Sequence, residues 1–105
     1  MESCTSVIAL AQYQGIQAFE QLEELYISFN EIDDLFDISF LEHLQVLDFE
    51  GNNVQEMSQL MYLRRCRNLM NANFKHNPVS SGQNAALYYE KMIELPRLAI
   101  LDDEV

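Results

Sequence analysis

The chain has 105 residues, of which 49% are hydrophobic and 22% charged, with only three glycines and two prolines. This length fits one domain, and this composition excludes collagen-like, linker-like and disordered chains. No apolar run approaches the roughly 20 residues of a membrane span, and no basic N-terminal region indicates a signal or transit peptide. We therefore expect a soluble, cytoplasmic protein with no membrane contact.

The formal net charge of −11 is unevenly distributed along the chain. Residues 1–63 contain twelve acidic residues and no lysine or arginine, whereas all six basic residues lie from Arg64 onward. Binding to nucleic acid depends on basic residues that release counterions from phosphates, so we expect no direct nucleic-acid partner. A one-signed acidic field favours a protein partner with a basic surface. The alternative is that the acidic residues only solvate the outer faces of the domain.

One pattern of apolar residues and asparagine occurs three times. The pattern LxxLxLxxNxL begins at Leu22, recurs 22 residues later at Leu44, and recurs again 25 residues later at Leu69. It is the signature of leucine-rich repeats, and the chain resembles that family. Within each copy, alternating apolar residues such as Leu25 and Ile27 predict a short strand with one inward face.

After each asparagine the apolar period changes from two to three. The second arm, for example, carries Val54, Met57, Leu60, Leu63, Cys66 and Leu69. This period is typical of a 3₁₀-like return arm. We therefore predict an α/β leucine-rich-repeat solenoid over residues 1–105, with short parallel strands on the concave face and irregular or 3₁₀ arms on the convex face. Residues 22–79 form its three repeats.

Residues 1–21 are predicted to form an incomplete N-terminal repeat. The period of three continues backwards through Leu22, Phe19, Ile16, Tyr13 and Leu10, which we interpret as an inward-facing return arm. Its strand is expected within residues 1–7, which contain no LxL, and Ile8 stands where asparagine is expected. Either upstream repeats are missing from this chain or its first strand is irregular.

Residues 80–105 are predicted to form a C-terminal cap. Pro78 closes the last repeat because it cannot donate to a continuing ladder, and residues 80–83 form a polar turn. Residues 84–95 read as a helix that covers the last coil with Leu87, Tyr88, Met92, Ile93 and Leu95. The succession of NPV, a tyrosine-bearing helix and LPxLxxLD resembles the C-terminal cap of intracellular leucine-rich-repeat proteins.

This arrangement assigns roles to two sets of residues. The outward strand positions form a candidate partner-binding column on the concave face: Glu24, Tyr26, Ser28, Val46, Asp48, Glu50, Asn71, Asn73 and Lys75. Tyr26 beside Asp48 suits a lysine or arginine of a partner. The alternative is that this column only solubilises the sheet and a partner uses an edge or the convex side.

The repeat asparagines Asn30, Asn52 and Asn77 have a structural role, because an amide can pair with buried turn backbone.

The remaining reactive side chains do not predict catalysis. Cys66 falls on an inward position and is expected to be a small buried hydrophobe, with Arg64, Arg65 and Arg67 on the convex surface. His43 and His76 have no partner at metal-ligand spacing, and Asp33, Asp34 and Asp37 lack the glycine-containing loop of an EF-hand. We expect no enzyme activity, no cofactor and no metal.

A closer resemblance is carried by particular segments. The sequences ELYISFN from Glu24, LQVLDFEGN from Leu44 and YLRRCRNL from Tyr62 resemble the repeats of the leucine-rich repeat-containing protein 56 family. The third repeat departs from the pattern because Ala72 replaces the inward leucine. This resemblance implies a ciliary or flagellar adaptor linked to dynein-arm assembly or intraflagellar transport. The alternatives are a regulatory subunit of a protein phosphatase and a scaffold like the A′ protein of the U2 particle, which would favour the nucleus.

Overall fold

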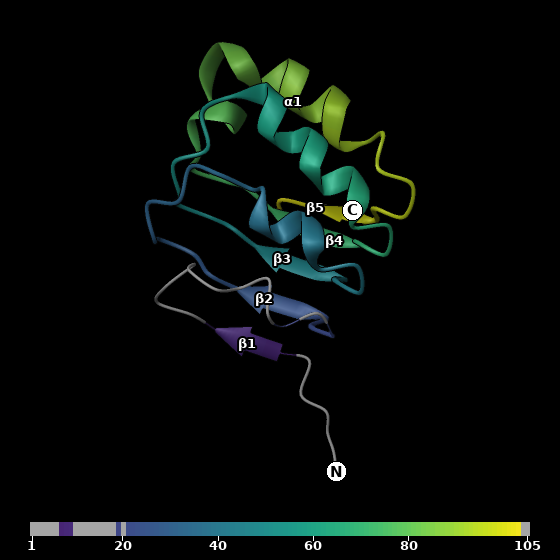
Figure 1. Ribbon diagram of the computed structural model, residues 1–105. Coiled ribbons are helices and arrows are strands. Elements are labelled where there is room, and N and C mark those ends of the chain that lie inside the picture. The colour runs from purple at the N-terminus through teal and green to yellow at the C-terminus, as the bar shows by residue number, and fades with distance from the viewer. Residues whose placement is uncertain (1–6, 10–18, 20, 104–105) are drawn as a thin grey trace.

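The computed structural model describes residues 7–9, 19 and 21–103. Within them, five short strands form one parallel sheet in chain order (Figure 1). They are β1 (Val7–Ala9), β2 (Glu24–Tyr26), β3 (Val46–Asp48), β4 (Asn71–Asn73) and β5 (Ile100–Leu101). Each strand belongs to a different coil of the chain, so the molecule is a solenoid whose neighbouring coils pair through their strands.

The register of the sheet is that of the sequence repeat. Leu25 of β2 lies opposite Leu47 of β3, which lies opposite Ala72 of β4. These three residues occupy the same position of the pattern in successive repeats. The sheet therefore stacks equivalent residues into columns, one per strand position.

Short helices form the return arms on one side of the sheet (Figure 1). They are the 3₁₀ helices η2 (Asp37–Phe40), η3 (Met57–Arg65), η4 (Pro78–Ser80) and η5 (Gly82–Asn84), and the α-helix α1 (Ala85–Met92). In a 3₁₀ helix residues three apart share a face, so Leu60 and Leu63 of η3 are both buried. The period of three in the sequence thus matches the arms that form.

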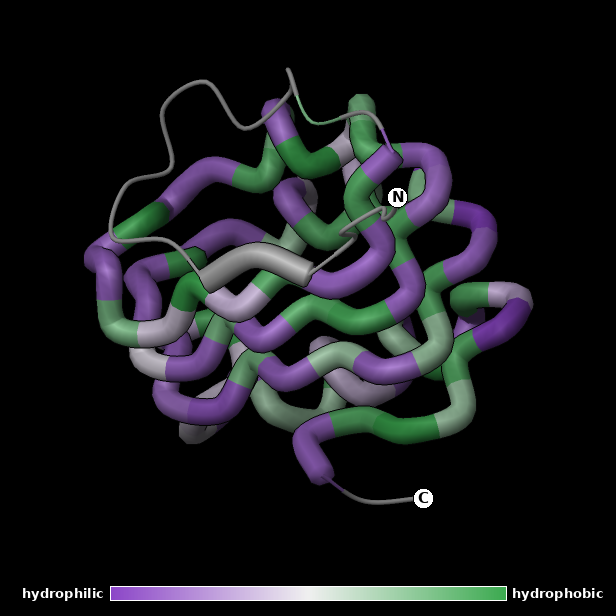
Figure 2. The backbone as a smooth tube through the Cα atoms, turned by 90° about the horizontal axis from the view of Figure 1, so that it is seen from below, coloured by the Kyte–Doolittle hydropathy of each residue, from purple (hydrophilic) through white to green (hydrophobic). Residues whose placement is uncertain are grey.

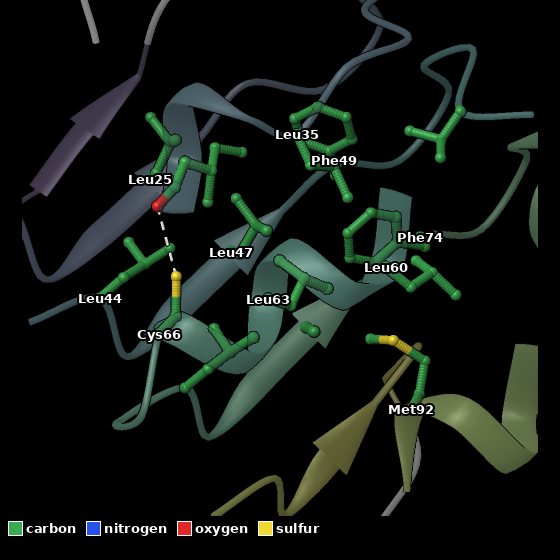
Figure 3. Packing of buried hydrophobic residues seen from close by; sticks show 14 of the residues in the cluster. Leu25, Leu35, Leu44, Leu47, Phe49, Leu60, Leu63, Cys66, Phe74 and Met92 are labelled. Atoms are coloured by element: carbon green, nitrogen blue, oxygen red, sulfur yellow. Dashed lines mark hydrogen bonds between the residues drawn. The ribbon is translucent and has the colours of Figure 1, made fainter. Parts of the chain in front are cut away.

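The core lies between the sheet and the arms, and Figure 3 shows the packing at its centre. Its largest fully buried side chains are Phe49, Phe74, Leu25, Ile27, Leu35, Ile38, Leu41, Leu44, Leu47, Leu63 and Leu69. The rings of Phe49 and Phe74, at equivalent positions of adjacent coils, lie with centroids 5.4 Å apart. Figure 2 shows polar and apolar stretches alternating along the coils. Among the described residues, no helix has both the length and the apolar character needed to cross a membrane.

The first strand differs from the prediction. It is β1 at Val7–Ala9, and Ile8 pairs with Leu25 instead of occupying the asparagine position. Val7 pairs with Glu24 and Glu24 with Val46, so the first coil is five residues shorter than the second, which shifts its strand along the chain. On the predicted inward arm, Leu22 is buried but Phe19 is 47% exposed. Positions 10, 13 and 16 lie outside the described residues.

The C-terminal segment also differs in detail. The α-helix covers Ala85–Met92 and is shorter than the predicted 84–95, because η5 precedes it and its last turn ends at Met92. Tyr88, Met92 and Leu95 are buried as predicted, whereas Leu87 and Ile93 are exposed. Leu87 directly precedes Tyr88 and Ile93 directly follows Met92 in the sequence. Successive residues are 100° apart around a helix, so Leu87 and Ile93 point away from the buried face. The strand β5 was not predicted, and it pairs Ile100 with Asn71 of β4.

Candidate functional site

The outward residues of the strands form a continuous column on the sheet face that points away from the core. Tyr26 lies opposite Asp48 and Asp48 opposite Asn73, while Glu24 lies opposite Val46, which lies opposite Asn71. Beyond the strands, the Phe29 N–H donates to Glu50 O at 2.8 Å and the Gly51 N–H to Lys75 O at 2.9 Å. These bonds continue the alignment, so Ser28, Glu50 and Lys75 form the last row of the column.

Carboxylates dominate the part of the column that β2 and β3 contribute. The Tyr26 hydroxyl donates to Glu24 Oε1 at 2.8 Å. This hydrogen bond, with smaller effects of burial and of the charges on Glu24 and Asp48, raises the pKa of Tyr26 above its usual value. Tyr26 is 36% exposed and the two carboxylates flank it, so its ring lies in a negative field open to solvent. This arrangement can receive a cation, which gains from both the aromatic face and the carboxylates.

Asn73 differs from its neighbours in the column because it is buried. Its Nδ2 donates to Glu50 Oε1 at 3.1 Å and to Asp48 Oδ1 at 3.4 Å. The two carboxylates thus cover the amide, which leaves Asn73 only 7% exposed. The sequence predicted an outward, partner-binding Asn73, but it did not reveal that acidic neighbours enclose this side chain. Asn73 therefore orients Asp48 and Glu50 and offers a partner little surface of its own.

Lys75 is paired at the other end of the column. Its Nζ lies 2.7 Å from Asp103 Oδ2 in an exposed ion pair, and this bond raises the pKa of Lys75. His76 lies beside the column, with Nε2 3.7 Å from Glu50 Oε2. The one lysine of the column is thereby matched by a carboxylate, so the face as a whole retains negative charge.

The repeat asparagines bridge adjacent coils where the chain leaves the sheet. Asn52 Oδ1 accepts the backbone N–H groups of Asn30 at 2.9 Å and Ile32 at 3.1 Å. Its Nδ2 donates to the carbonyl oxygens of Ile27 and Phe49, each at 3.1 Å. A single amide thus satisfies several backbone groups of two coils that would otherwise be buried without partners.

Asn77 repeats this arrangement one coil later. Its Oδ1 accepts the Val54 N–H at 3.0 Å and its Nδ2 donates to Phe49 O at 2.9 Å. Both Asn52 and Asn77 are buried, at 5% and 1% exposure. Asn30 is half-buried, and its Nδ2 donates to Ser28 O at 2.8 Å. These contacts give the three asparagines a role in the fold.

The residue before each of these asparagines has a left-handed backbone. Phe29, Gly51 and His76 have φ of 58°, 73° and 62°. The sharp turn that brings each asparagine under its strand requires this conformation. Only Gly51 adopts it without the steric cost of a Cβ atom. A glycine in the sequence indicates a left-handed turn at Gly51, whereas the residue types at Phe29 and His76 do not.

Cys66 and the neighbouring arginines lie as predicted. Cys66 is buried beside Ile38 O, 3.3 Å from its Sγ (Figure 3), and burial raises the pKa of the thiol to about 12. This is the opposite of the lowered pKa that a reactive cysteine needs. Arg64 and Arg65 are exposed at the end of η3, and Arg67 is exposed in the turn that follows. No group of three or more His, Cys, Asp or Glu side chains suited to a metal ion occurs within the described part of the chain.

The acidic residues of the arm between β2 and β3 have a local role. Asp34 Oδ1 accepts the Phe36 N–H at 2.7 Å, which fixes the turn before η2. Asp33 is exposed, and Asp37 begins η2. These carboxylates are therefore arm residues at the surface.

Comparison with known proteins agrees with this architecture. No protein-family model matches the chain. Leucine-rich repeat-containing protein 56 of Mus musculus is 37% identical over 106 residues, a match that covers 90% of this chain and 19% of that protein. The chain therefore spans about a fifth of the length of this relative.

Two solved structures have the same fold. The Drosophila melanogaster SNF/U2A′ complex matches with a TM-score of 0.68 and 30% identity, covering 82% of this chain and 49% of that chain. The Chaetomium Mex67:Mtr2 subunits match with a TM-score of 0.67 and 24% identity, covering 88% of this chain and 61% of that chain. The chain is therefore a leucine-rich-repeat protein, and its sequence is similar to that of leucine-rich repeat-containing protein 56.

Proposed function

We propose that the chain is a non-catalytic protein-binding module that uses its concave column. The observation that carries the proposal is the pair Tyr26 and Asp48, which the sheet aligns across adjacent coils and which Asn73 of the next coil helps to orient. An exposed aromatic ring between carboxylates matches a lysine or arginine side chain of a partner, and a parallel sheet holds these groups rigidly in place. The partner therefore presents a basic surface to this column.

The similarity to leucine-rich repeat-containing protein 56 supports a finer proposal. The family resemblance implies an adaptor of cilia or flagella, concerned with dynein-arm assembly or intraflagellar transport. In this proposal the column holds a component of that machinery, and the protein acts in the cytoplasm and the cilium.

A second candidate is a scaffold like the U2A′ protein. The solved SNF/U2A′ complex contains a chain whose sequence is 30% identical to this one over the matched region. This alternative predicts a nuclear partner and uses the same sheet. A regulatory subunit of a protein phosphatase is a third candidate, which rests on the resemblance of the repeats alone.

Affinity capture from the source cells tests the proposal. The wild-type chain is compared with a triple variant, Tyr26→Ala, Asp48→Ala and Lys75→Ala, that removes the centre of the column. The control carries Tyr89→Ala, Glu90→Ala and Lys91→Ala, which also removes one tyrosine, one acidic and one basic side chain, here from the exposed face of α1.

We expect the wild type and the control to retain the same specific partner and the column variant to lose it. Dynein or transport components among the lost proteins would support the ciliary proposal. A spliceosomal protein or a phosphatase catalytic subunit would support the second or the third candidate instead. If both triple variants retain every partner, the concave column is not the binding surface.

A further inference from the structure

The turns that lead from the arms into the strands form a second column, on one lateral side of the solenoid (Figure 1). Each turn has two residues between the last inward residue of the arm and the first leucine of the next segment. The pairs are Glu42 and His43 before β3, Arg67 and Asn68 before β4, and Pro96 and Arg97 before β5. All three turns close with the same backbone bond, such as Leu69 N–H to Cys66 O at 3.1 Å. Asn68 Nδ2 also reaches Glu42 O of the preceding turn, at 3.4 Å.

This side of the molecule concentrates the positive charge of an acidic protein. A surface hollow of about 960 Å³ is lined by Arg64, Arg65, Arg67, Arg97 and His43. Four of the six basic residues of the chain therefore line one hollow. Glu42 is the one acidic residue among its described lining residues. We call this surface the basic hollow.

Most of these arginines are available for a ligand. Arg64 is bonded to Glu94, with Nη2 2.7 Å from Oε1. Arg65, Arg67 and Arg97 are exposed and make no ion pair with any other residue in the described ranges. Uncompensated guanidinium groups that two adjacent coils hold together repel one another, and bound carboxylates relieve that repulsion. Phe40, which is 44% exposed, and Pro96 add apolar surface to the rim.

We propose that the basic hollow binds a short acidic segment of a partner protein, whose carboxylates pair with Arg65, Arg67 and Arg97. Strands of a sheet lie about 4.8 Å apart, so Arg67 and Arg97 stand on adjacent turns at about that spacing. The three turns together span roughly 10 Å, which an extended segment of three or four residues covers. Phe40 and Pro96 receive an apolar side chain of the same segment. This surface differs in place and in sign of charge from the concave column, so the inference does not depend on the proposed function.

The charge of the whole molecule favours a peptide over a nucleic acid. A nucleic acid carries phosphates along its entire length and would run past the short hollow onto a protein of net charge −11. An acidic peptide segment places a few charges within the hollow and can turn away beyond it. The guanidinium fork binds carboxylates in two-point geometry, which gives the contact direction as well as charge.

The test is binding of a fluorescent ten-residue peptide with alternating glutamate and leucine, measured by anisotropy on the whole chain. Its control peptide has glutamine at every glutamate position. The variant Arg67→Gln with Arg97→Gln is compared with Lys75→Gln with Lys91→Gln, which removes the same charge outside the hollow. A third variant, Glu42→Gln, removes the acidic lining residue. Thermal melts establish that each variant is folded.

We expect the Arg67→Gln with Arg97→Gln variant to bind the glutamate peptide with a Kd about tenfold or more higher, because two charge-assisted contacts are lost. The lysine pair should change the Kd by less than about twofold, and Glu42→Gln should strengthen binding by removing repulsion. Binding should also weaken as salt rises from about 50 to 500 mM.

Other results overturn the proposal. Equal losses in the arginine and lysine pairs would mean that only net charge matters. Binding of the glutamine peptide with equal affinity, or no binding of either peptide, would exclude acidic recognition. Preference for a twelve-nucleotide RNA over the peptide would make the occupant a nucleic acid. Self-association that the arginine pair abolishes would make it a second copy of the chain.

Discussion

The carboxylate of Asp102 accepts the backbone N–H of Phe74, with Oδ1 2.7 Å from the nitrogen. In the preceding coils the equivalent N–H groups of Ile27 and Phe49 donate to backbone carbonyls of the next strand. Asp102 follows β5, and its φ of 53° turns the chain out of the sheet. Its side chain therefore supplies the acceptor at the point where regular strand pairing stops.

The same carboxylate joins the sheet to the capping helix. The Tyr88 hydroxyl from α1 donates to Asp102, with 2.9 Å and 3.0 Å to the two carboxylate oxygens. Burial, and then the charge and hydrogen bond of Asp102, raise the pKa of Tyr88 well above its usual value. The cap thus depends on one acidic residue that bonds to both the last full strand and the helix.

Asp102→Ala should lower the free energy of unfolding by about 2 to 3 kcal/mol, because the Phe74 N–H and the Tyr88 hydroxyl lose their acceptor. Asp102→Asn keeps one acceptor oxygen and should cost less, about 1 kcal/mol. Urea unfolding at pH 7 measures both values. The control is Asp103→Ala, which removes an exposed ion pair with Lys75 and should cost less than Asp102→Asn. Equal losses for Asp102→Ala and Asp103→Ala would show that Asp102 does not hold the cap.

Asn52→Ala should cost about 1 to 3 kcal/mol, since it leaves turn backbone of two coils without partners in the interior. Asp48→Ala, at a half-buried outward position of the concave column, should cost less, about 1 kcal/mol, because it removes only the long hydrogen bonds from Asn73 and the Glu50 N–H. Thermal melts of the two variants provide the comparison. A larger loss for Asp48→Ala would reverse the assignment of inward and outward positions.

Gly51→Ala should be destabilising by more than the about 1 to 2 kcal/mol that a left-handed backbone with a Cβ atom costs. Its φ is 73°, and an added Cβ would clash with the Phe29 ring. In a Phe29→Ala background the ring is absent, so only the backbone part of the cost remains. A double-mutant cycle from denaturant unfolding measures the coupling. Strict additivity of the two substitutions would mean that Phe29 moves aside without cost.

The repeat pattern was sufficient to predict strands β2 to β4 and their relative register. Leu25, Leu47 and Ala72 align in the sheet because each coil must place its inward residue against the same column of the core. The period of three likewise predicted the buried face of η3, because 3₁₀ geometry places residues three apart together. These features are local or recur from coil to coil, so they can be recognised in a single sequence.

The features that the sequence did not reveal depend on contacts between distant residues. Ile100 and Leu101 form a strand only because β4 offers them an edge. Asn73 is enclosed because Glu50 and Asp48 of the preceding coil reach it. The basic hollow brings Arg97 beside Arg67 only when two turns 30 residues apart stack. In each case the sequence contains the residues but not the alignment that joins them.

The stability of the protein should decrease in alkaline solution through Cys66. Burial raises the pKa of this thiol from 9.0 to about 12. The folded pKa is above the unfolded value, so the stabilisation is fully present below about pH 9 and is lost as the pH rises toward about 12. Urea unfolding under reducing conditions should show wild type losing more free energy between pH 8 and about 10.5 than Cys66→Ala does. Parallel losses in both proteins would mean that the thiol titrates normally.

The outer edge of the sheet at β1 should allow weak self-association of the isolated chain. Within the described residues β1 pairs only with β2, so its other edge presents backbone donors and acceptors that can pair with a second strand. The net charge of −11 opposes contact between two copies, and salt screens this repulsion. Association should therefore increase between about 50 mM and 500 mM salt, whereas attraction between opposite charges would weaken over the same range. Light scattering coupled to size exclusion measures the change in mass. A chain that stays strictly monomeric at high concentration in high salt would mean that the edge at β1 is covered.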